Sequence, residues 1–146
     1  MIVRLNVRRS QSLVVIREGK QRYSHAPRPS RVAVRDERRS QRFFSAYFGF
    51  APATAQEYED GTVIIRNADG FDLALHPFGH VKPSSAFLHA GFKAAEPADV
   101  RALMERMEAD GITIVERNDE AAYVAFKCLD PDGHRIEVYW EPLRSR

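Results

Sequence analysis

The stretch DPDGHRIEVYW, residues 130–140, decides the fold of this chain. It begins with a turn, because Pro131 fixes φ at about −65° for the first corner and Gly133 accepts a positive φ. The residues after the turn, and the run YVAFKCL at residues 123–129 before it, are short and rich in strand-forming side chains. We therefore predict a β-hairpin over residues 123–140.

Glu137 is an acidic residue in an otherwise apolar part of this hairpin, between Ile136 and Val138. Because side chains alternate between the two faces of a strand, Glu137 points either to solvent or into a polar cavity. A solvated face is the ordinary explanation for such a carboxylate. The polar-cavity explanation is favoured because the same pattern occurs a second time. GFDLAL at residues 70–75 has Asp72 in the place of Glu137.

The chain contains two copies of one order of elements, a strand followed by a helix and three strands. Asp36 caps the first helix and Glu96 opens the second, sixty residues later. Gly49 and Gly111 follow the ends of the two helices. The predicted strands are residues 31–35, 54–58, 62–66, 71–76, 87–93, 113–117, 123–129 and 135–140. This repeat predicts two βαβββ modules.

Composition limits the classes of function. The protein has 146 residues, of which 44% are hydrophobic and 29% charged, as is normal for one globular domain. No apolar run approaches the ~20 residues that a membrane span needs, so no membrane partner is expected. The single Cys128 excludes an intrachain disulfide, and the default for such a chain is the reducing cytoplasm.

Charge is distributed unevenly along the chain. Residues 1–28 hold seven Lys and Arg against one acid, a net charge of +6, and the remainder holds fifteen against nineteen, a net charge of −4. The mildly acidic domain therefore offers no basic face, and we expect no nucleic-acid partner.

The segment of residues 1–28 allows three interpretations. It fits a hairpin over residues 12–23, an Arg- and Ser-rich organelle transit peptide, or a flexible extension. We expect the extension. The domain then covers residues 29–142, with modules at about 29–78 and 86–142, and residues 143–146 form a tail.

Residues 29–142 resemble the vicinal oxygen chelate superfamily, which includes glyoxalase I, bleomycin-resistance proteins, thiol-transferring fosfomycin-resistance enzymes and extradiol ring-cleaving dioxygenases. The matching stretches are VRD at 34–36, SQRFFSAYFGF at 40–50, LHAGF at 88–92 and, most specific of all, DPDGHRIE at 130–137. The resemblance implies an α+β fold. Its two βαβββ modules form a cupped, mixed β-sheet with helices on the outside and a divalent metal ion inside.

The resemblance also implies a set of metal ligands. The family's ligand at the start of the second module falls on His89, its last-strand carboxylate on Glu137, and its fourth-strand carboxylate on Asp72. The first-strand ligand, commonly His or Gln, falls on Pro29, which has no donor atom. The site is therefore one ligand short, and His25 replaces that ligand only if its segment refolds.

Strand alternation is compatible with these positions without reference to any family. If the apolar side chains of each strand pack against a helix, the residues between them lie on the other face of the sheet. All the candidate site residues then share that face. Carboxylates and imidazoles together suit Mn, Fe, Ni or Zn, and nearby cations suit an anionic or enolate-like ligand. The predicted metal ligands are Asp72, His89 and Glu137, with Glu137 also the catalytic base, and the predicted substrate-binding residues are Arg31, His76, Lys93 and Tyr139.

Each of these residues also has an ordinary structural explanation. A strand histidine such as His89 is commonly hydrogen-bonded rather than ligating, and an acid near a turn, such as Asp72, is commonly solvated. His76 precedes a proline and suits a strand end. Arg31 and Lys93 suit ordinary surface charges.

Two classes of function remain open. The first is a metal-dependent enzyme of lyase, isomerase or transferase type that acts on a small oxygen-rich or anionic substrate. The second is a metal-free protein that sequesters a small molecule, like the bleomycin-resistance members. Pro29 favours the second class, whereas His89 and Glu137 favour the first, which we expect.

Ring-cleaving dioxygenation fits poorly. Such enzymes usually have a Tyr where Lys127 stands, and a His where this chain has NDE at residues 118–120. Because two-module members of the family commonly pair, and because Tyr139 would otherwise be exposed, we expect a homodimer.

Overall fold

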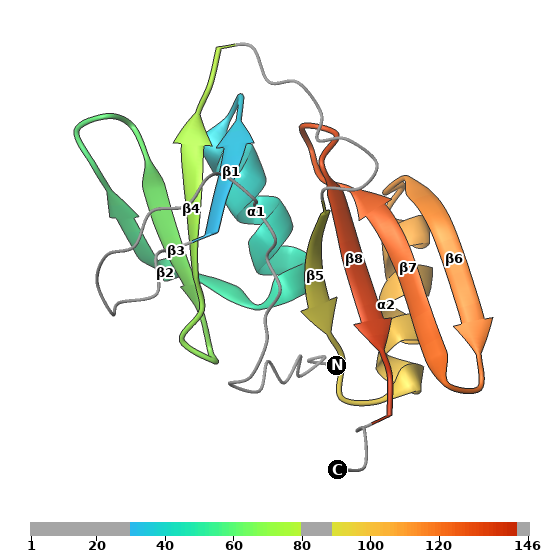
Figure 1. The fold of residues 1–146 in the computed structure, drawn as a ribbon. Helices are drawn as coiled ribbons and strands as arrows, with labels where there is room; N and C mark the ends of the chain where they lie inside the picture. The colour runs from blue at the N-terminus through green and yellow to red at the C-terminus, as the bar shows by residue number, and fades with distance from the viewer. Residues whose placement is uncertain (1–29, 80–88, 143–146) are drawn as a thin grey trace, which may run out of the picture.

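The computed structural model of the chain describes residues 30–79 and 89–142. The predicted extension at residues 1–28 and the predicted tail at 143–146 lie outside the described residues, as do the side chains of Ser30, His89 and Ala90. The two described parts are drawn in colour in Figure 1.

The described elements repeat the order βαβββ, which confirms the predicted α+β fold of two modules. The first module contains β1 (Ser30–Val34), α1 (Glu37–Phe48), β2 (Phe50–Glu57), β3 (Val63–Asn67) and β4 (Asp72–Pro77). The second contains β5 (His89–Lys93), α2 (Pro97–Ala109), β6 (Ile114–Glu120), β7 (Tyr123–Leu129) and β8 (Arg135–Trp140). Neither described helix has the length and apolar character needed to cross a membrane.

Each module builds its own four-stranded mixed sheet. The strand order is β1-β4-β3-β2 in the first sheet and β5-β8-β7-β6 in the second. In each sheet the module's first strand pairs in parallel with its last strand, and the other neighbours are antiparallel. The two sheets therefore have the same topology, as expected for an internal repeat.

Helix α1 begins and ends at the residues that the sequence indicates. The side chain of Asp36 accepts a hydrogen bond from the backbone N–H of Arg39 at 2.9 Å, which caps the helix. Gly49 follows with φ of 70°, and its N–H donates to the carbonyl of Phe44. The left-handed backbone at this position explains the glycine.

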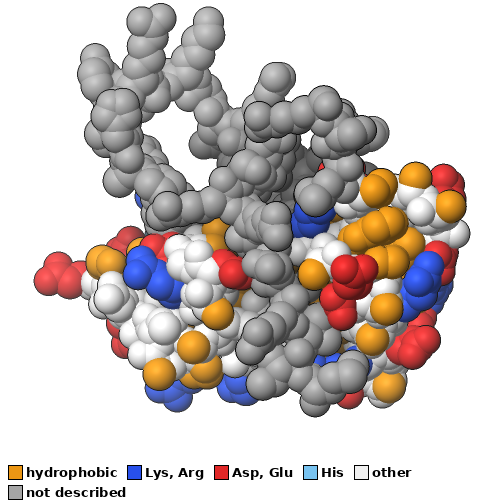
Figure 2. Space-filling view, turned by 90° about the horizontal axis from the view of Figure 1, so that it is seen from below, with side chains coloured by type: hydrophobic (Ala, Val, Ile, Leu, Met, Phe, Trp, Pro, Cys, Tyr) orange, Lys and Arg blue, Asp and Glu red, His pale blue; other side chains and the backbone are white. Residues whose placement is uncertain are grey.

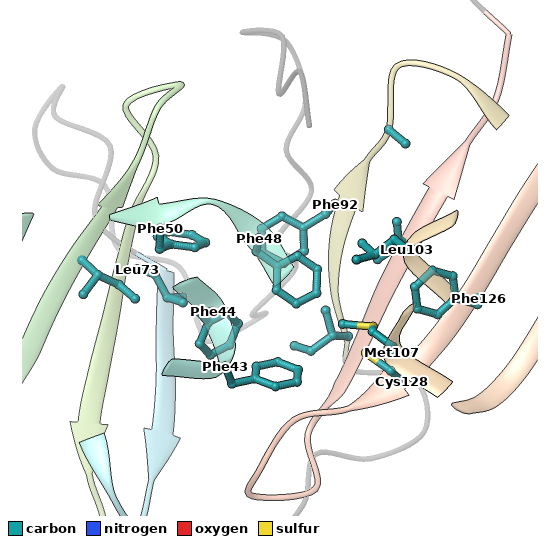
Figure 3. Close-up of a cluster of buried hydrophobic side chains, with 14 of the residues drawn as sticks. Phe43, Phe44, Phe48, Phe50, Leu73, Phe92, Leu103, Met107, Phe126 and Cys128 are labelled. Atoms are coloured by element: carbon teal, nitrogen blue, oxygen red, sulfur yellow. The ribbon is translucent and has the colours of Figure 1, made fainter. Parts of the chain in front are cut away.

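One hydrophobic core joins the two modules, with α1 between the two sheets (Figure 1). Phe48 of α1 stacks on Phe92 of β5 with ring centroids 4.4 Å apart. Figure 3 shows Phe43, Phe44 and Phe48 facing a group from the second module that includes Met107. Each sheet thus has one face against a helix and one face turned away from the core.

The strand alternation predicted from the sequence is confirmed on both sheets. The positions that are predicted to face the core are buried: Val34, Leu73, Leu75, Phe92, Ile136 and Val138. The intervening positions, which include the candidate site residues, belong to the opposite faces.

The DPDGH turn connects the second module to the first. The Asp132 carboxylate, which is fully buried, accepts hydrogen bonds from the Arg35 backbone N–H at 3.2 Å and from Arg39 Nη2 at 3.1 Å. His134 Nε2 donates to the carbonyl oxygen of Ala33 at 2.7 Å. We call these three contacts the turn latch.

Candidate functional site

The predicted site residues with described side chains lie on the faces of the sheets that point away from the helices, and they divide between the two sheets. Arg31, Asp72 and His76 belong to the first sheet, and Lys93, Glu137 and Tyr139 to the second. The backbone of His89 pairs with Arg135 in the second sheet, but the structure does not describe the His89 side chain. Strand alternation predicted the face of each residue, but not this division.

A hollow of about 730 Å³ lies on the first sheet. Arg31, Ile64, Ala74 and His76 line it from the strands, and Tyr58 lines it from the β2–β3 connection. Its charged lining has both signs, because it also includes Glu57, Glu59 and Asp60.

His76 is held within this hollow rather than simply ending its strand. A hydrogen bond of 2.7 Å joins His76 Nδ1 to Thr62 Oγ1, and Asp60 Oδ2 lies 4.0 Å from the same nitrogen. Backbone and side-chain hydrogen bonds from Thr62 hold the pKa of Asp60 below its usual value. The carboxylate of Asp60 therefore stays ionised beside the imidazole at neutral pH.

Asp72 has both carboxylate oxygens paired with one arginine. Arg66 Nε donates to Oδ1 and Arg66 Nη2 donates to Oδ2, each at 2.7 Å. The two residues stand directly opposite each other on β3 and β4. Hydrogen bonding to Arg66 lowers the pKa of Asp72. Asp72 can therefore reach a metal ion only if this ion pair opens.

Glu137 is the acidic residue at the centre of the second sheet's open face. Its Oε1 accepts a hydrogen bond from the phenol of Tyr123 at 2.8 Å. Burial, and then the hydrogen bond to Glu137, raise the pKa of Tyr123, so that the phenol stays protonated and donates. On the edge strand β5, Gly91 pairs with Glu137 in register.

Two further predicted residues flank Glu137. Lys93 Nζ lies 3.4 Å from Glu141 Oε1 and 5.9 Å from the centre of the Tyr139 ring. Burial raises the pKa of Tyr139. The rings of Tyr139 and Tyr123 lie 6.4 Å apart at an interplanar angle of 32°. The open face of the second sheet thus combines a carboxylate, an ammonium and two aromatic rings.

Acidic and basic side chains are interspersed over both modules on the face shown in Figure 2. They are not separated by sign into one basic and one acidic region. On this face the described residues thus offer no extended basic surface of the kind that binds nucleic acid.

The described side chains fit a metal ion in part. Among the side chains that the structure describes, which do not include His89, no three His, Cys, Asp or Glu residues lie close enough together to hold one. Glu137 fits as a single ligand, because its carboxylate is oriented by Tyr123 on an open face. Asp72 does not fit while Arg66 holds both of its oxygens. A site at Glu137 therefore requires donors beyond the described side chains.

Two residues at these sites were not predicted from the sequence, Arg66 and Tyr123. The sequence does contain a signal for the pairing of Arg66 with Asp72. Counting outward from the turn at residues 67–71 places the two residues opposite each other. Tyr123 had none, because it lies fourteen residues from Glu137 and is not its register partner.

Comparison with known proteins identifies relatives of this chain. A sequence model of the glyoxalase/bleomycin resistance protein/dioxygenase superfamily matches residues 24–138. The glutathione transferase FosA of Serratia marcescens is 37% identical over 62 residues, which are 42% of this chain and 43% of that protein. The chain thus aligns with less than half the length of this relative.

Two solved structures share the fold over most of the chain. A possible glyoxalase from Bacillus cereus superposes with a TM-score of 0.65 at 26% identity, covering 79% of this chain and 98% of that one. The fosfomycin resistance protein FosX from Listeria monocytogenes, solved with Mn(II) and sulfate, superposes with a TM-score of 0.67 at 14% identity, covering 83% and 94%. Since the family model spans most of the chain, including both modules, this protein belongs to the glyoxalase/bleomycin resistance protein/dioxygenase superfamily, as the resemblance to vicinal oxygen chelate proteins predicted.

Proposed function

We propose that this protein is a divalent-metal-dependent enzyme of lyase, isomerase or transferase type that acts on a small oxygen-rich or anionic substrate. The observation that carries the proposal is Glu137, a half-buried carboxylate oriented by Tyr123 on the open face of β8. Two relatives support it. FosA is a glutathione transferase, and the FosX structure holds Mn(II) and sulfate.

The proposed ligands are Glu137 and His89, with Asp72 as a third once Arg66 releases it. Carboxylate and imidazole donors suit Mn, Fe, Ni or Zn. A divalent ion held there would supply Lewis-acid polarisation of a substrate oxygen. Because Pro29 provides no donor, the set of protein ligands is small and leaves positions for substrate oxygens.

The chain's own residues supply the remaining chemistry. Glu137 takes up and returns the proton at the reacting carbon or oxygen, as the catalytic base. Tyr123 holds Glu137 Oε1 during this transfer, and Lys93 places a positive charge on the same face. Arg31 and His76 bind the remote part of the substrate from the hollow of the first sheet.

The proposal includes a homodimer, which the division of these residues between two sheets supports. Two copies related by a twofold axis can bring the open face of one copy's first sheet toward the other copy's second sheet. Sedimentation equilibrium at micromolar concentration is expected to give twice the chain mass, and a monomer would contradict this part of the proposal. The cytoplasm remains the expected location.

Calorimetric titration of the metal-free protein with Mn, Ni and Zn tests the proposal. We expect micromolar binding by the wild type and its loss in Glu137→Gln and in His89→Ala. Glu141→Gln is the control, because it neutralises another carboxylate on the same side of the sheet. Variants that bind as well as the wild type would contradict the proposed site.

A metal-free binding protein is the second candidate function. The hollow of about 730 Å³ on the first sheet and the occupied carboxylate of Asp72 favour it. A wild type that binds none of the three metals in the same titration would replace the first proposal with this one.

A further inference from the structure

A second hollow lies on the first module, along the side of α1 that faces away from the core. Its volume is about 390 Å³. Five of the lining residues are spaced three or four apart along the helix, so they share one face of it, and one residue of the edge strand β2 completes the set. We call it the helix hollow, and its lining consists of Arg38, Gln41, Arg42, Ser45, Ala46 and Pro52.

Two arginines one helical turn apart give the helix hollow a positive charge. Arg38 and Arg42 occupy positions i and i+4, where like charges destabilise a helix. Arg38 also lies in the first turn of α1, at the positive end of the helix dipole. Both residues are exposed, and within the described part of the chain neither forms an ion pair with a carboxylate. An anion bound between the two guanidinium groups would relieve this repulsion.

The two acids at the start of α1 leave the helix hollow positively charged. The Asp36 carboxylate caps the helix by accepting the backbone N–H of Arg39 at 2.9 Å. This hydrogen bond is the main cause of the lowered pKa of Asp36, and the charge of Arg42 contributes less. Glu37 is next to Arg38 in the chain, and adjacent residues of a helix do not face each other. Neither acid lines the hollow.

The second module shows how the same fold provides partners for arginines on the matching helix. Arg101 occupies on α2 the position that Gln41 occupies on α1, five residues after the N-cap. Its guanidinium makes two hydrogen bonds to Asp119 of β6, at 2.8 and 2.5 Å. Arg106, one turn further along, lies 5.0 Å from the centre of the Tyr47 ring. These arginines of α2 thus have partners that the arginines of the helix hollow lack among the described side chains.

The edge strands account for this difference between the modules. β6 carries Asp119, which pairs with Arg101. β2 carries small residues, APA at 51–53, and Pro52 among them lines the helix hollow. The acid of β2, Glu57, lines the hollow of the first sheet instead. The first module therefore leaves its arginines without a carboxylate and keeps space beside them.

We propose that the helix hollow binds an anionic phosphate group, either free or carried by a small molecule. A guanidinium can donate two parallel N–H bonds to phosphate oxygens, so Arg38 and Arg42 can hold one tetrahedral anion from adjacent turns. The Gln41 amide and the Ser45 hydroxyl line the same space and can donate further hydrogen bonds. The site is separate from the open faces of the sheets, so the inference goes beyond the proposed function and does not depend on a metal ion.

Separate titrations with inorganic phosphate and with phenyl phosphate test the inference. The full chain is used in the presence of a chelator, so that no metal ion holds the anion, and sodium chloride keeps the ionic strength constant. The readouts are the backbone amide NMR signals of α1 and the thermal unfolding of each protein. Arg38→Gln and Arg42→Gln each remove one guanidinium. Arg101→Gln is the matched control, because Asp119 already neutralises that arginine.

We expect both phosphates to shift the amide signals of residues 38–46 in the wild type. Each variant in the helix hollow is expected to weaken binding by about tenfold or more, as is typical when a hydrogen bond to a charged group is lost. Thermal stability without phosphate is expected to stay level or rise in both, because a like-charge contact is removed. Arg101→Gln is expected to bind as the wild type does. Tighter binding of phenyl phosphate would identify a phosphate ester as the ligand, and equal binding would identify free phosphate.

Three results would overturn the inference. The first is a wild type in which phosphate moves the signals of α1 no further than chloride does. The second is a loss of binding in Arg101→Gln as large as the loss in Arg38→Gln. The third is binding that Glu137→Gln abolishes and Arg38→Gln retains, since the anion would then lie on the second sheet. The titration with metal ions is independent of all three, so the proposed function and this inference can fail separately.

Discussion

The ion pair between Arg66 and Asp72 decides how many protein ligands the proposed site has. Arg66→Met is expected to strengthen metal binding, because it releases both oxygens of Asp72. Calorimetric titration with Mn(II) measures the change. Arg101→Met is the matched control, since it breaks a similar two-point pair with Asp119 on the second module. An unchanged affinity in Arg66→Met would show that Asp72 is not a ligand.

Asp130 at the start of the DPDGH turn makes stability depend on pH. Its Oδ1 accepts backbone N–H bonds from Asp132 and His134, whereas its buried Oδ2 has no hydrogen-bond partner among the described residues. Burial raises the pKa of Asp130 above its usual 3.8. Because the folded state then binds the proton more tightly, the contribution of Asp130 is favourable at low pH. This stabilising contribution to the free energy of unfolding decreases as the pH rises from about 3.9, the usual pKa of an unfolded Asp, through the pKa of Asp130 in the folded state.

Asp130→Asn is expected to remove this decrease of the unfolding free energy with rising pH. An amide oxygen still accepts the two backbone bonds and carries no charge that titrates. Urea unfolding of wild type and variant between pH 4 and pH 7 measures the slope of the unfolding free energy. The lowered pKa values of Asp60 and Asp72 affect stability up to about pH 5, but equally in the wild type and the variant, so they cancel when the two slopes are compared. Equal slopes in the two proteins would contradict the assignment.

The turn latch links the two modules in addition to the hydrophobic core that they share. Asp132→Ala is expected to lower the unfolding free energy by about 2 kcal/mol, the range for a lost hydrogen bond to a charged group. Urea unfolding measures it. Asp119→Ala, which removes an exposed carboxylate, is expected to change stability far less. A loss no greater than that of Asp119→Ala would show that the latch does not stabilise the fold.

The sequence predicted the elements well because their signals are local. The cap at Asp36, the glycine after α1 and the DPDG turn each depend on a few neighbouring residues. Strand alternation likewise predicted the faces of Leu73 and Ile136 correctly.

The site was less predictable because it depends on contacts between strands. Which sheet each candidate joins follows from the pairing of β1 with β4 and of β5 with β8. The hydrogen bond from Tyr123 to Glu137 depends on the direction of a side chain along the sheet. Neither the strand pairing nor the direction of this side chain can be predicted from a short run of residues.

At the level of the whole molecule, the described residues of the two modules share one hydrophobic core. Removing residues 1–26 is therefore expected to leave cooperative thermal unfolding nearly unchanged. The core residues of both modules, the stacked Phe48 and Phe92, and the turn latch all remain. A large loss of thermal stability in the shortened protein would show that the N-terminal segment contributes to the core.

The whole-molecule arrangement also places two of the predicted ligands, Asp72 and Glu137, on different sheets. The carboxylates of Asp72 and Glu137 belong to different sheets, each with a face turned away from the core (Figure 1). A shared α1 and the turn latch hold the modules in this relation. The predicted homodimer would bring such faces together.

The proposed function depends above all on Glu137 as a ligand of a divalent metal ion. A crystal structure of the protein soaked in Mn(II), with anomalous diffraction data, tests it most directly. The expected result is an anomalous peak at about 2.0–2.2 Å from a carboxylate oxygen of Glu137, with His89 as a second ligand. A structure with no peak at Glu137, or with the ion held elsewhere on the chain, would contradict it.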